Sequence, residues 1–338
     1  MKAESWCHFK MEYVKFGNTG LDVSPVCLGA MSFGDTARWP HHQWLLDEEN
    51  SRTIIKRAIE LGINFFDTAN VYSRGASEEI LGRALKDFAN RDEIVIATKV
   101  YYAAADGPNN SGLSRKAIHS AVDNSLARLG TDYIDLYIAH RWDNNTPIEE
   151  TMEAFHDIVK AGKVRYIGAS TMYAWQFMKA QCIAEKYNWT KYISMQNHYS
   201  LLYREEEREM LPLCADQKIA VTPYAPLAKG RLARAWEGDT QRYKTDPNAK
   251  RKFDDFSKDI DMPVVERVGE LAEKHGVPRA HVALAWLWQK PQVVSPVIGA
   301  TKTFHIEDAV RALEFKLTDE EMAYLEELYV PHKFYGPR

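Results

Sequence analysis

Residues 51–69 read SRTIIKRAIELGINFFDTA, and this stretch holds one helical pattern followed directly by one strand pattern. The apolar residues between positions 54 and 59 recur at the spacing of one helix face. Gly62 follows, and glycine readily adopts the left-handed backbone conformation found at helix ends. The apolar run at 63–69 has the length of a buried strand. The stretch therefore predicts a helix–strand step of an α/β protein.

The same step recurs along the chain. Residues 114–130 form a second helical pattern, and residues 146–162 form a third. In the third pattern Thr146 is the expected N-cap, Pro147 lies in the first turn, and Glu149 occupies the capping-box position. These helices alternate with short apolar runs, as βαβ units do.

The apolar runs are rich in Val, Ile, Phe and Tyr, and there are eight of them. They read VCLGAM (26–31), INFFDTA (63–69), EIVIATKV (93–100), IDLYIAH (134–140), VRYIGAS (164–170), YISMQNHY (192–199), IAVTPYAP (219–226) and VVSPVIGA (293–300). Strands that alternate with helices favour a parallel sheet. Eight such units favour a closed (β/α)8 TIM barrel over an open doubly wound sheet.

The remaining segments fit around one barrel. Residues 14–25 predict an N-terminal β-hairpin that caps the barrel, because turn residues separate two short apolar runs. Residues 35–50 and about 231–261 are expected to be long loops at the C-terminal face. The predicted organisation is a short N-terminal arm at 1–10 and a single barrel domain at 11–338.

Composition limits the classes of protein to consider. The chain has 338 residues, of which 45% are hydrophobic and 27% charged, as in a soluble globular protein. A formal charge of −4 gives no basic field for nucleic acid or an anionic membrane. Four cysteines without a CxxC pair argue against a zinc site or a disulfide framework. Without a membrane-length apolar run or a signal peptide, we expect a cytoplasmic protein.

Polar residues follow the apolar strands at one end, strand after strand. They are Asp67, with Tyr72 in the loop beyond it, Lys99, His140, Ser170, Gln196 and Tyr224. Taken singly, Asp67 could cap a turn, Lys99 could be a solvated loop lysine, and His140 could lie on the surface. The C-terminal ends of parallel barrel strands share one rim, however, so these side chains are expected to converge there.

Four of these residues fit one proton-transfer chemistry. A tyrosine with an ordinary pKa near ~10 is a poor acid at neutral pH. A neighbouring lysine such as Lys99 favours the phenolate and lowers the pKa of Tyr72. Asp67 can keep that lysine charged in a partly dry site. Tyr72 could then give a proton to a carbonyl oxygen while His140 orients the same oxygen.

Six motifs make the chain resemble the aldo-keto reductases over about residues 14–328. They are FFDTANVYSRGASEEILGRAL (65–85), IVIATKV (94–100), DYIDLYIAHRWD (132–143), VRYIGAS (164–170), YAPLAKGRL (224–232) and VIGATKTFHIEDA (297–309). The resemblance implies a (β/α)8 barrel and an ordered reaction with NADP(H). It also implies a catalytic tetrad of Asp67, Tyr72, Lys99 and His140. A Rossmann GxGxxG motif is absent, as expected of a barrel that binds the cofactor.

The resemblance places cofactor contacts on several loops. These positions are Gly29, Met31, Asp67, Ser170, Thr171, Gln196, Tyr224, Pro226, Leu227, Lys229, Gly230, Arg231, Gly299, Thr301, Lys302, His305 and Asp308. Ser170 and Gln196 are implied to bind the nicotinamide carboxamide, and Tyr224 is implied to stack on its ring. Five residues, at three places in the chain, depart from the family pattern. Thr171 replaces the usual Asn, which weakens the carboxamide clamp, and the pairs Thr301-Lys302 and Asp308-Ala309 replace Ser-Arg and Glu-Asn.

Aromatic residues near the rim suggest a cleft for apolar or aromatic carbonyl compounds. The expected lining is Met31, Phe33, Tyr101, Tyr102, Trp142, Tyr173 and Tyr199. The leading hypothesis is an NADPH-dependent reductase of aldehydes or ketones. One alternative is a cofactor-binding, redox-sensing subunit with little turnover. Another is an isomerase-like or reductive use of the barrel on sugar phosphates, with Arg141 as the anion contact. The oligomeric state is left open.

Overall fold

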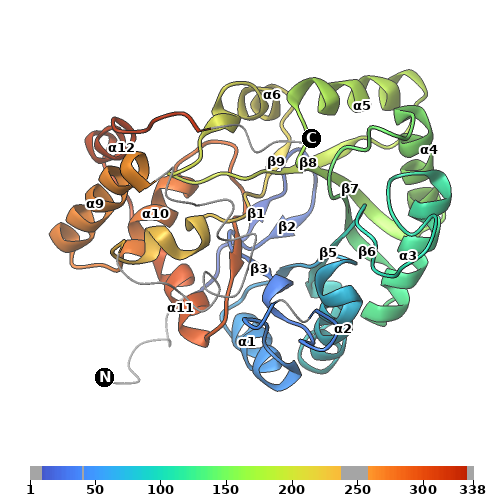
Figure 1. Cartoon of the computed structure of the whole chain (residues 1–338), viewed down its shortest axis with the longest axis horizontal. Coiled ribbons are helices and arrows are strands. Elements are labelled where there is room, and N and C mark those ends of the chain that lie inside the picture. Colours follow the sequence, from blue (N-terminus) through green and yellow to red (C-terminus); the bar gives the residue numbers. More distant parts are fainter. Residues whose placement is uncertain (1–9, 40–41, 237–257, 333–338) are drawn as a thin grey trace.

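The computed structural model describes residues 10–39, 42–236 and 258–332 (Figure 1). Its strands are β1 (Val14–Lys15), β2 (Asp22–Val23), β3 (Cys27–Gly29), β4 (Phe65–Asp67), β5 (Val95–Val100), β6 (Ile134–Ala139), β7 (Val164–Ser170), β8 (Tyr192–Gln196), β9 (Ala220–Val221) and β10 (Val297–Gly299). Its α-helices are α1 (Glu48–Glu60), α2 (Ala76–Phe88), α3 (Arg115–Leu129), α4 (Ile148–Lys160), α5 (Ala174–Lys186), α6 (Met210–Asp216), α9 (Lys258–His275), α10 (Arg279–Trp288), α11 (Thr303–Arg311) and α12 (Asp319–Glu326). None of the helices in these ranges is both long and apolar enough to cross a bilayer.

Eight parallel strands form one curled sheet in the order β10-β3-β4-β5-β6-β7-β8-β9. Its two edges approach each other, because parallel bridges join Val221 to Val293 and Tyr224 to Val297. The amide of Val297 also donates to the carbonyl of Pro223 at 2.8 Å. Figure 1 shows helices surrounding the strands. The architecture is consistent with a (β/α)8 fold, and each of the eight predicted runs contains one of these strands.

The two hydrophobic cores follow from strand alternation. Residues such as Phe65, Val95 and Leu136 point into the ring of strands and pack together there. Most other apolar side chains, including Ile54 and Ile55 of α1, fill the layer between strands and helices. Gly62 after α1 has φ 82°, and a Cβ on it would lie 2.8 Å from the Cβ of Met11. The predicted helix end at this glycine is therefore confirmed.

The third predicted helix begins differently from the expectation. Pro147 is the N-cap of α4, and no side chain caps this end. The hydroxyl of Thr146 instead donates to Asp143 Oδ2 at 2.8 Å. The prediction of Thr146 as the N-cap was wrong, because a nearby carboxylate competes for its hydroxyl.

The segments outside the alternation are only partly described. β1 pairs antiparallel with β2, and the ring of Phe16 between them lies 5.5 Å from that of Phe65, edge to face. This places the hairpin against the interior of the sheet. The predicted N-terminal arm falls almost wholly outside the described residues. Most of the expected loop at 231–261 does so too, and α9 begins inside its last residues.

Candidate active site

A buried ion pair lies at the C-terminal ends of β4 and β5. Lys99 has no exposed surface, and Asp67 is 2% exposed. Lys99 Nζ lies 2.5 Å from Asp67 Oδ1 and donates to the backbone carbonyl of Thr68 at 2.7 Å. Gln196 of β8 donates from Nε2 to the other oxygen, Asp67 Oδ2, at 3.0 Å. Each charge is therefore compensated at a depth where an unpaired charge would be very costly.

The charge state of Lys99 follows from this pairing. Burial acts to lower its pKa, but the charges of Asp67 and then Tyr72 act the other way and leave the pKa raised. Lys99 consequently stays protonated at neutral pH. A fixed cation at this position favours the ionised form of any phenol beside it.

Tyr72 is that phenol. Lys99 Nζ donates to its hydroxyl at 3.4 Å and lies 5.0 Å from the centre of its ring. The turn that follows is strained, because Ser73 and Arg74 have φ values of 49° and 51°. Ser73 Oγ accepts from the amide of Asp35 and donates to its carbonyl, both at 2.9 Å. This long-range contact supports the backbone that positions Tyr72.

His140 follows β6 and faces two tyrosine rings. Its ring centre lies 5.9 Å from that of Tyr72 and 5.1 Å from that of Tyr102, edge to face in both cases. Burial lowers its pKa well below the ordinary value, and the charges of Lys99 and Arg141 lower it further. His140 is therefore neutral at physiological pH. Within the described residues, its buried Nδ1 has no hydrogen-bond partner.

This histidine predicts a loss of stability on acidification. The unfolded chain protonates His140 near pH ~6.5, whereas the folded protein resists protonation, so stability is full above that pH and falls below it. We expect the wild type to lose up to about 1.4 kcal/mol more per pH unit than His140→Asn between pH 6.5 and 5. Urea unfolding at pH 5 to 8 measures this difference. Parallel stability curves for the two proteins would contradict a neutral, buried His140.

The candidate carboxamide residues are already hydrogen-bonded to one another. Ser170, the last residue of β7, donates from Oγ to the backbone carbonyl of Gln196 at 2.9 Å. Thr171 has φ 46°, and its hydroxyl lies 3.2 Å from Ser170 Oγ and is also bonded to the hydroxyl of Tyr224. Thr171, which stands where the family pattern has Asn, thus places a hydroxyl between Ser170 and Tyr224.

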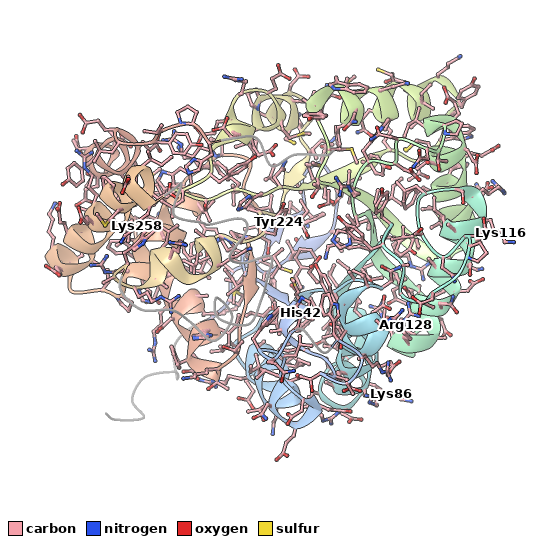
Figure 2. The ribbon with its side chains drawn as sticks, viewed as in Figure 1. His42, Lys86, Lys116, Arg128, Tyr224 and Lys258 are labelled. Atoms are coloured by element: carbon pink, nitrogen blue, oxygen red, sulfur yellow. The ribbon has the colours of Figure 1, made fainter. Side chains whose placement is uncertain are left out.

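Tyr224 lies at the end of a stack of rings. Its ring lies 5.2 Å from that of His198 at an interplanar angle of 7°, and His198 in turn stacks on Tyr203 at 4.3 Å. Burial raises the pKa of Tyr224. Figure 2 shows Tyr224 near the middle of the view, inside the surrounding helices. The sequence analysis missed His198 and Tyr203. The signal for His198 was its spacing of two from Gln196, which puts both on one strand face.

The other candidate cofactor residues lie on two loops. Four residues of the 225–230 turn have left-handed backbone, with φ 54° at Ala225, 46° at Ala228, 56° at Lys229 and 93° at Gly230. Pro226 and Leu227 lie within this turn, and the Arg231 guanidinium after it lies 4.2 Å from the centre of the Trp236 ring. Successive left-handed residues form concave backbone turns of the kind that bind anions.

The second loop follows β10. Lys302 is the N-cap of α11, and its Nζ lies 5.8 Å from the Phe304 ring centre. The amide of Thr301 donates to His305 Nδ1 at 3.2 Å. Burial lowers the pKa of His305, and the charge of Lys302 lowers it further. Lys302 is consequently the permanent cation among the candidates on this loop.

The remaining cofactor candidates lie near these loops or at the neighbouring strand ends. Gly29 and Gly299 end β3 and β10 in register, and a Cβ on Gly29 would lie 2.7 Å from Val297 Cγ1. Met31 follows β3 and is partly exposed. Asp308 lies in α11, 3.7 Å from Arg311.

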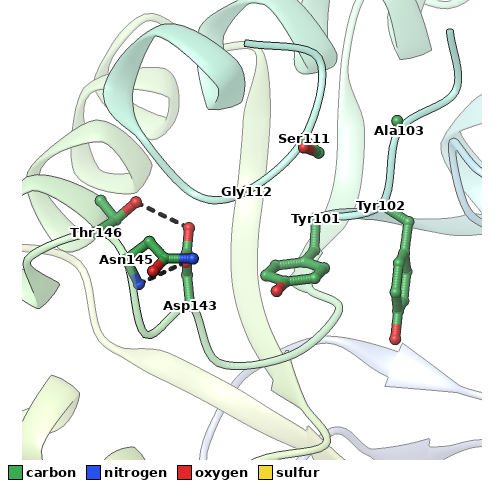
Figure 3. Close-up of a pocket in the computed structure, with 8 residues that line it drawn as sticks. All are labelled: Tyr101, Tyr102, Ala103, Ser111, Gly112, Asp143, Asn145 and Thr146. Atoms are coloured by element: carbon green, nitrogen blue, oxygen red, sulfur yellow. Dashed lines mark hydrogen bonds between the residues drawn. The ribbon is translucent and has the colours of Figure 1, made fainter. Parts of the chain in front are cut away.

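A cavity of about 380 Å³ opens beside the predicted rim (Figure 3). It is lined by Tyr101, Tyr102, Ala103, Ser111, Gly112, Asp143, Asn145 and Thr146. Trp142 is buried, with its ring 6.0 Å from that of Trp175, and Tyr173 is exposed. Phe33 and Tyr199 have no exposed surface and lie in the core, so neither lines a pocket here. Their position corrects the expectation that both belong to the aromatic wall.

Comparison with known proteins identifies the family. A family model described as the Aldo/keto reductase family matches residues 25–330. The chain is 44% identical over 340 residues to the versiconal hemiacetal acetate reductase of Aspergillus parasiticus, covering 95% of this chain and 98% of that protein. It is 43% identical over 341 residues to the aldo-keto reductase AMT2 of Alternaria alternata, covering 94% and 91%. It is 38% identical over 342 residues to the putative aryl-alcohol dehydrogenase AAD16 of Saccharomyces cerevisiae, covering 96% and 98%. The chain therefore belongs to the aldo/keto reductase family.

Proposed function

We propose that this protein reduces aldehydes or ketones to alcohols with NADPH, and that Tyr72 is the proton donor. The observation that carries the proposal is the position of Lys99, which bonds Asp67 at 2.5 Å and reaches the Tyr72 hydroxyl at 3.4 Å. A fully buried lysine bonded to both groups is what a phenol needs in order to act as an acid near neutral pH.

The residues around this cluster fit a nicotinamide nucleotide. The Tyr224 ring has one face on His198, so its opposite face is the one that can stack on a nicotinamide. The left-handed turn at 225–230, with Lys229 and Arg231, suits a pyrophosphate. The bound cofactor would supply the hydride that reduces the carbonyl carbon.

The side chains of the chain itself would handle the proton. Tyr72 donates its hydroxyl proton to the carbonyl oxygen, and the charge of Lys99 stabilises the phenolate that remains. Asp67 keeps Lys99 charged, and Gln196 holds Asp67 in place. Neutral His140 orients the same carbonyl oxygen, because a hydrogen-bond donor aimed there stabilises developing charge.

The substrates are proposed to be small aromatic or apolar carbonyl compounds. Tyr101 and Tyr102 line the cavity beside the cluster. The names of the relatives, a hemiacetal acetate reductase and an aryl-alcohol dehydrogenase, are in keeping with this class. A test follows NADPH absorbance over a panel of aromatic aldehydes, dicarbonyls and keto sugars. Tight NADPH binding without turnover on any of them would instead support a redox-sensing subunit.

Lys302 is expected to give a preference for NADPH over NADH. The two cofactors differ by one 2′-phosphate, and a charge-assisted hydrogen bond to it contributes roughly 1.5–3 kcal/mol. Since about 1.4 kcal/mol is tenfold in affinity, one lysine predicts a tenfold to hundredfold preference. Dissociation constants of both cofactors, measured by fluorescence titration for the wild type and Lys302→Ala, would show this.

The variant should lose NADPH affinity and keep NADH affinity. The preference should also shrink in high salt, because Lys302 is exposed and its charge is screened there. Lys316→Ala, which removes an exposed cation away from this loop, is the control. Equal losses for both cofactors would show that Lys302 does not contact the 2′-phosphate.

A further inference from the structure

Arg141 is a partly buried cation next to the proton-transfer cluster. It follows His140 directly and lies beyond the end of β6. Its Nη1 donates to the hydroxyl of Tyr102 at 3.1 Å, and its guanidinium lies 5.7 Å from the ring centre of Tyr101. Both contacts are to neutral aromatic side chains, so neither cancels its charge.

Three other partly buried arginines in the described ranges are paired with carboxylates. The side chains of Arg57, Arg128 and Arg204 are 22%, 20% and 12% exposed, and each lies within 3 Å of a glutamate oxygen. Arg141 has no carboxylate within 4 Å among the described residues. A partly desolvated cation without a counter-ion is costly, and the cost falls when an anion binds.

The nearest acid in sequence does not supply that counter-ion. Asp143 Oδ2 accepts from the amide of Leu113 at 2.7 Å and from the hydroxyl of Thr146 at 2.8 Å. Its Oδ1 accepts from the amide of Asn145 at 2.9 Å. Figure 3 shows Asp143 turned toward Asn145 and Thr146. The Asp143 carboxylate therefore stabilises the 143–146 loop and its contact with Leu113.

The position of Arg141 relative to the reacting atoms is fixed through Tyr102. That ring lies 5.1 Å from the ring of His140, and its hydroxyl accepts the hydrogen bond from Arg141. Arg141 and His140 therefore contact the same aromatic side chain, and that side chain also lines the cavity. The charge of Arg141 is also felt at His140, where it contributes to the lowered pKa.

We propose that Arg141 binds a carboxylate of the substrate and makes the site selective for carbonyl compounds that carry one. A guanidinium presents parallel N–H donors that match a carboxylate, and it keeps its charge in a partly buried site. Tyr101 and Tyr102 beside it suit an aromatic ring between the carboxylate and the carbonyl. This assignment rests on the proposed reductase function, because it concerns the substrate of the same site.

The first test compares two substrates that differ in charge at one position. 4-Carboxybenzaldehyde is an anion at neutral pH, and methyl 4-formylbenzoate is its neutral ester. In Arg141→Met the ratio of kcat/KM for the acid to kcat/KM for the ester should fall at least about tenfold. Arg52→Met is the matched control, because Arg52 is already paired with Asp87 at 2.6 Å and belongs to α1 rather than to the turn after Tyr72. In that control the ratio should stay within about twofold of the wild type.

The second test measures binding without turnover. Calorimetry with benzoate should show affinity at least about tenfold lower in Arg141→Met than in the wild type, with no such difference for benzamide. Absence of any reduction by the wild type would refute the proposed function, while the benzoate difference would still support the anion site. An unchanged acid-to-ester ratio together with unchanged benzoate affinity would overturn the assignment of Arg141.

Discussion

Tyr72→Phe is expected to lower kcat for carbonyl reduction by about 10²–10⁴-fold, the usual contribution of a positioned general acid. The substitution removes the hydroxyl that Lys99 contacts at 3.4 Å and keeps the ring that packs edge to face with His140. NADPH affinity should therefore survive, because no predicted cofactor contact is lost. Steady-state kinetics on an aromatic aldehyde, together with NADPH titration, measure the two effects separately.

A second phenol provides the control. Tyr187→Phe removes a hydroxyl from an exposed ring that stacks on Trp189, and its kcat should equal that of the wild type. Comparable thermal unfolding of both variants and the wild type would show that the fold is intact. Near-normal turnover in Tyr72→Phe would mean that another group donates the proton.

The convergence of the tetrad could be predicted because topology decides it. In a parallel barrel every strand delivers its C-terminal residue to one rim, so polar residues at 67, 99 and 140 had to meet. The residue types alone then led to the proposed proton-transfer chemistry. In the structure Lys99 contacts both Asp67 and Tyr72, which is the arrangement that this proposal requires.

Other features could not be predicted, because competing local contacts or tertiary packing decide them. The cap of α4 depended on whether Thr146 would bond its own helix or Asp143. The aromatic residues Phe33 and Tyr199 had the composition of a pocket wall, but tertiary packing encloses both. Sequence pattern gives the type of a side chain and its strand face, whereas exposure depends on what packs over it.

The strained turn after Tyr72 is another feature that could not be predicted from the sequence. Gly75 was a visible signal for a left-handed residue, but Ser73 and Arg74 adopt that conformation as well. Their backbone is supported by hydrogen bonds between Ser73 and Asp35, 38 residues away in the sequence. Local propensity argues against this geometry, and only the assembled loops make it stable.

Lys99→Met is expected to abolish turnover and also to destabilise the protein by about 3–5 kcal/mol. Methionine fills a similar volume, but it leaves the Asp67 carboxylate buried with Gln196 as its one remaining side-chain partner of those the structure shows. Most of the cost comes from this uncompensated charge rather than from lost packing. Urea unfolding at neutral pH measures the stability, and the NADPH assay measures turnover.

The double variant Asp67→Asn/Lys99→Met separates the structural role of the pair from its catalytic role. The side-chain amide introduced at position 67 carries no charge and can still accept a hydrogen bond from Gln196, so most of the lost stability should return. Turnover should not return, because Tyr72 would still lack the cation that stabilises its phenolate. If the single variant is as stable as the wild type, Asp67 is not held as a buried anion. If the double variant regains turnover, Tyr72 does not depend on Lys99, and the proton-transfer role of the pair is excluded.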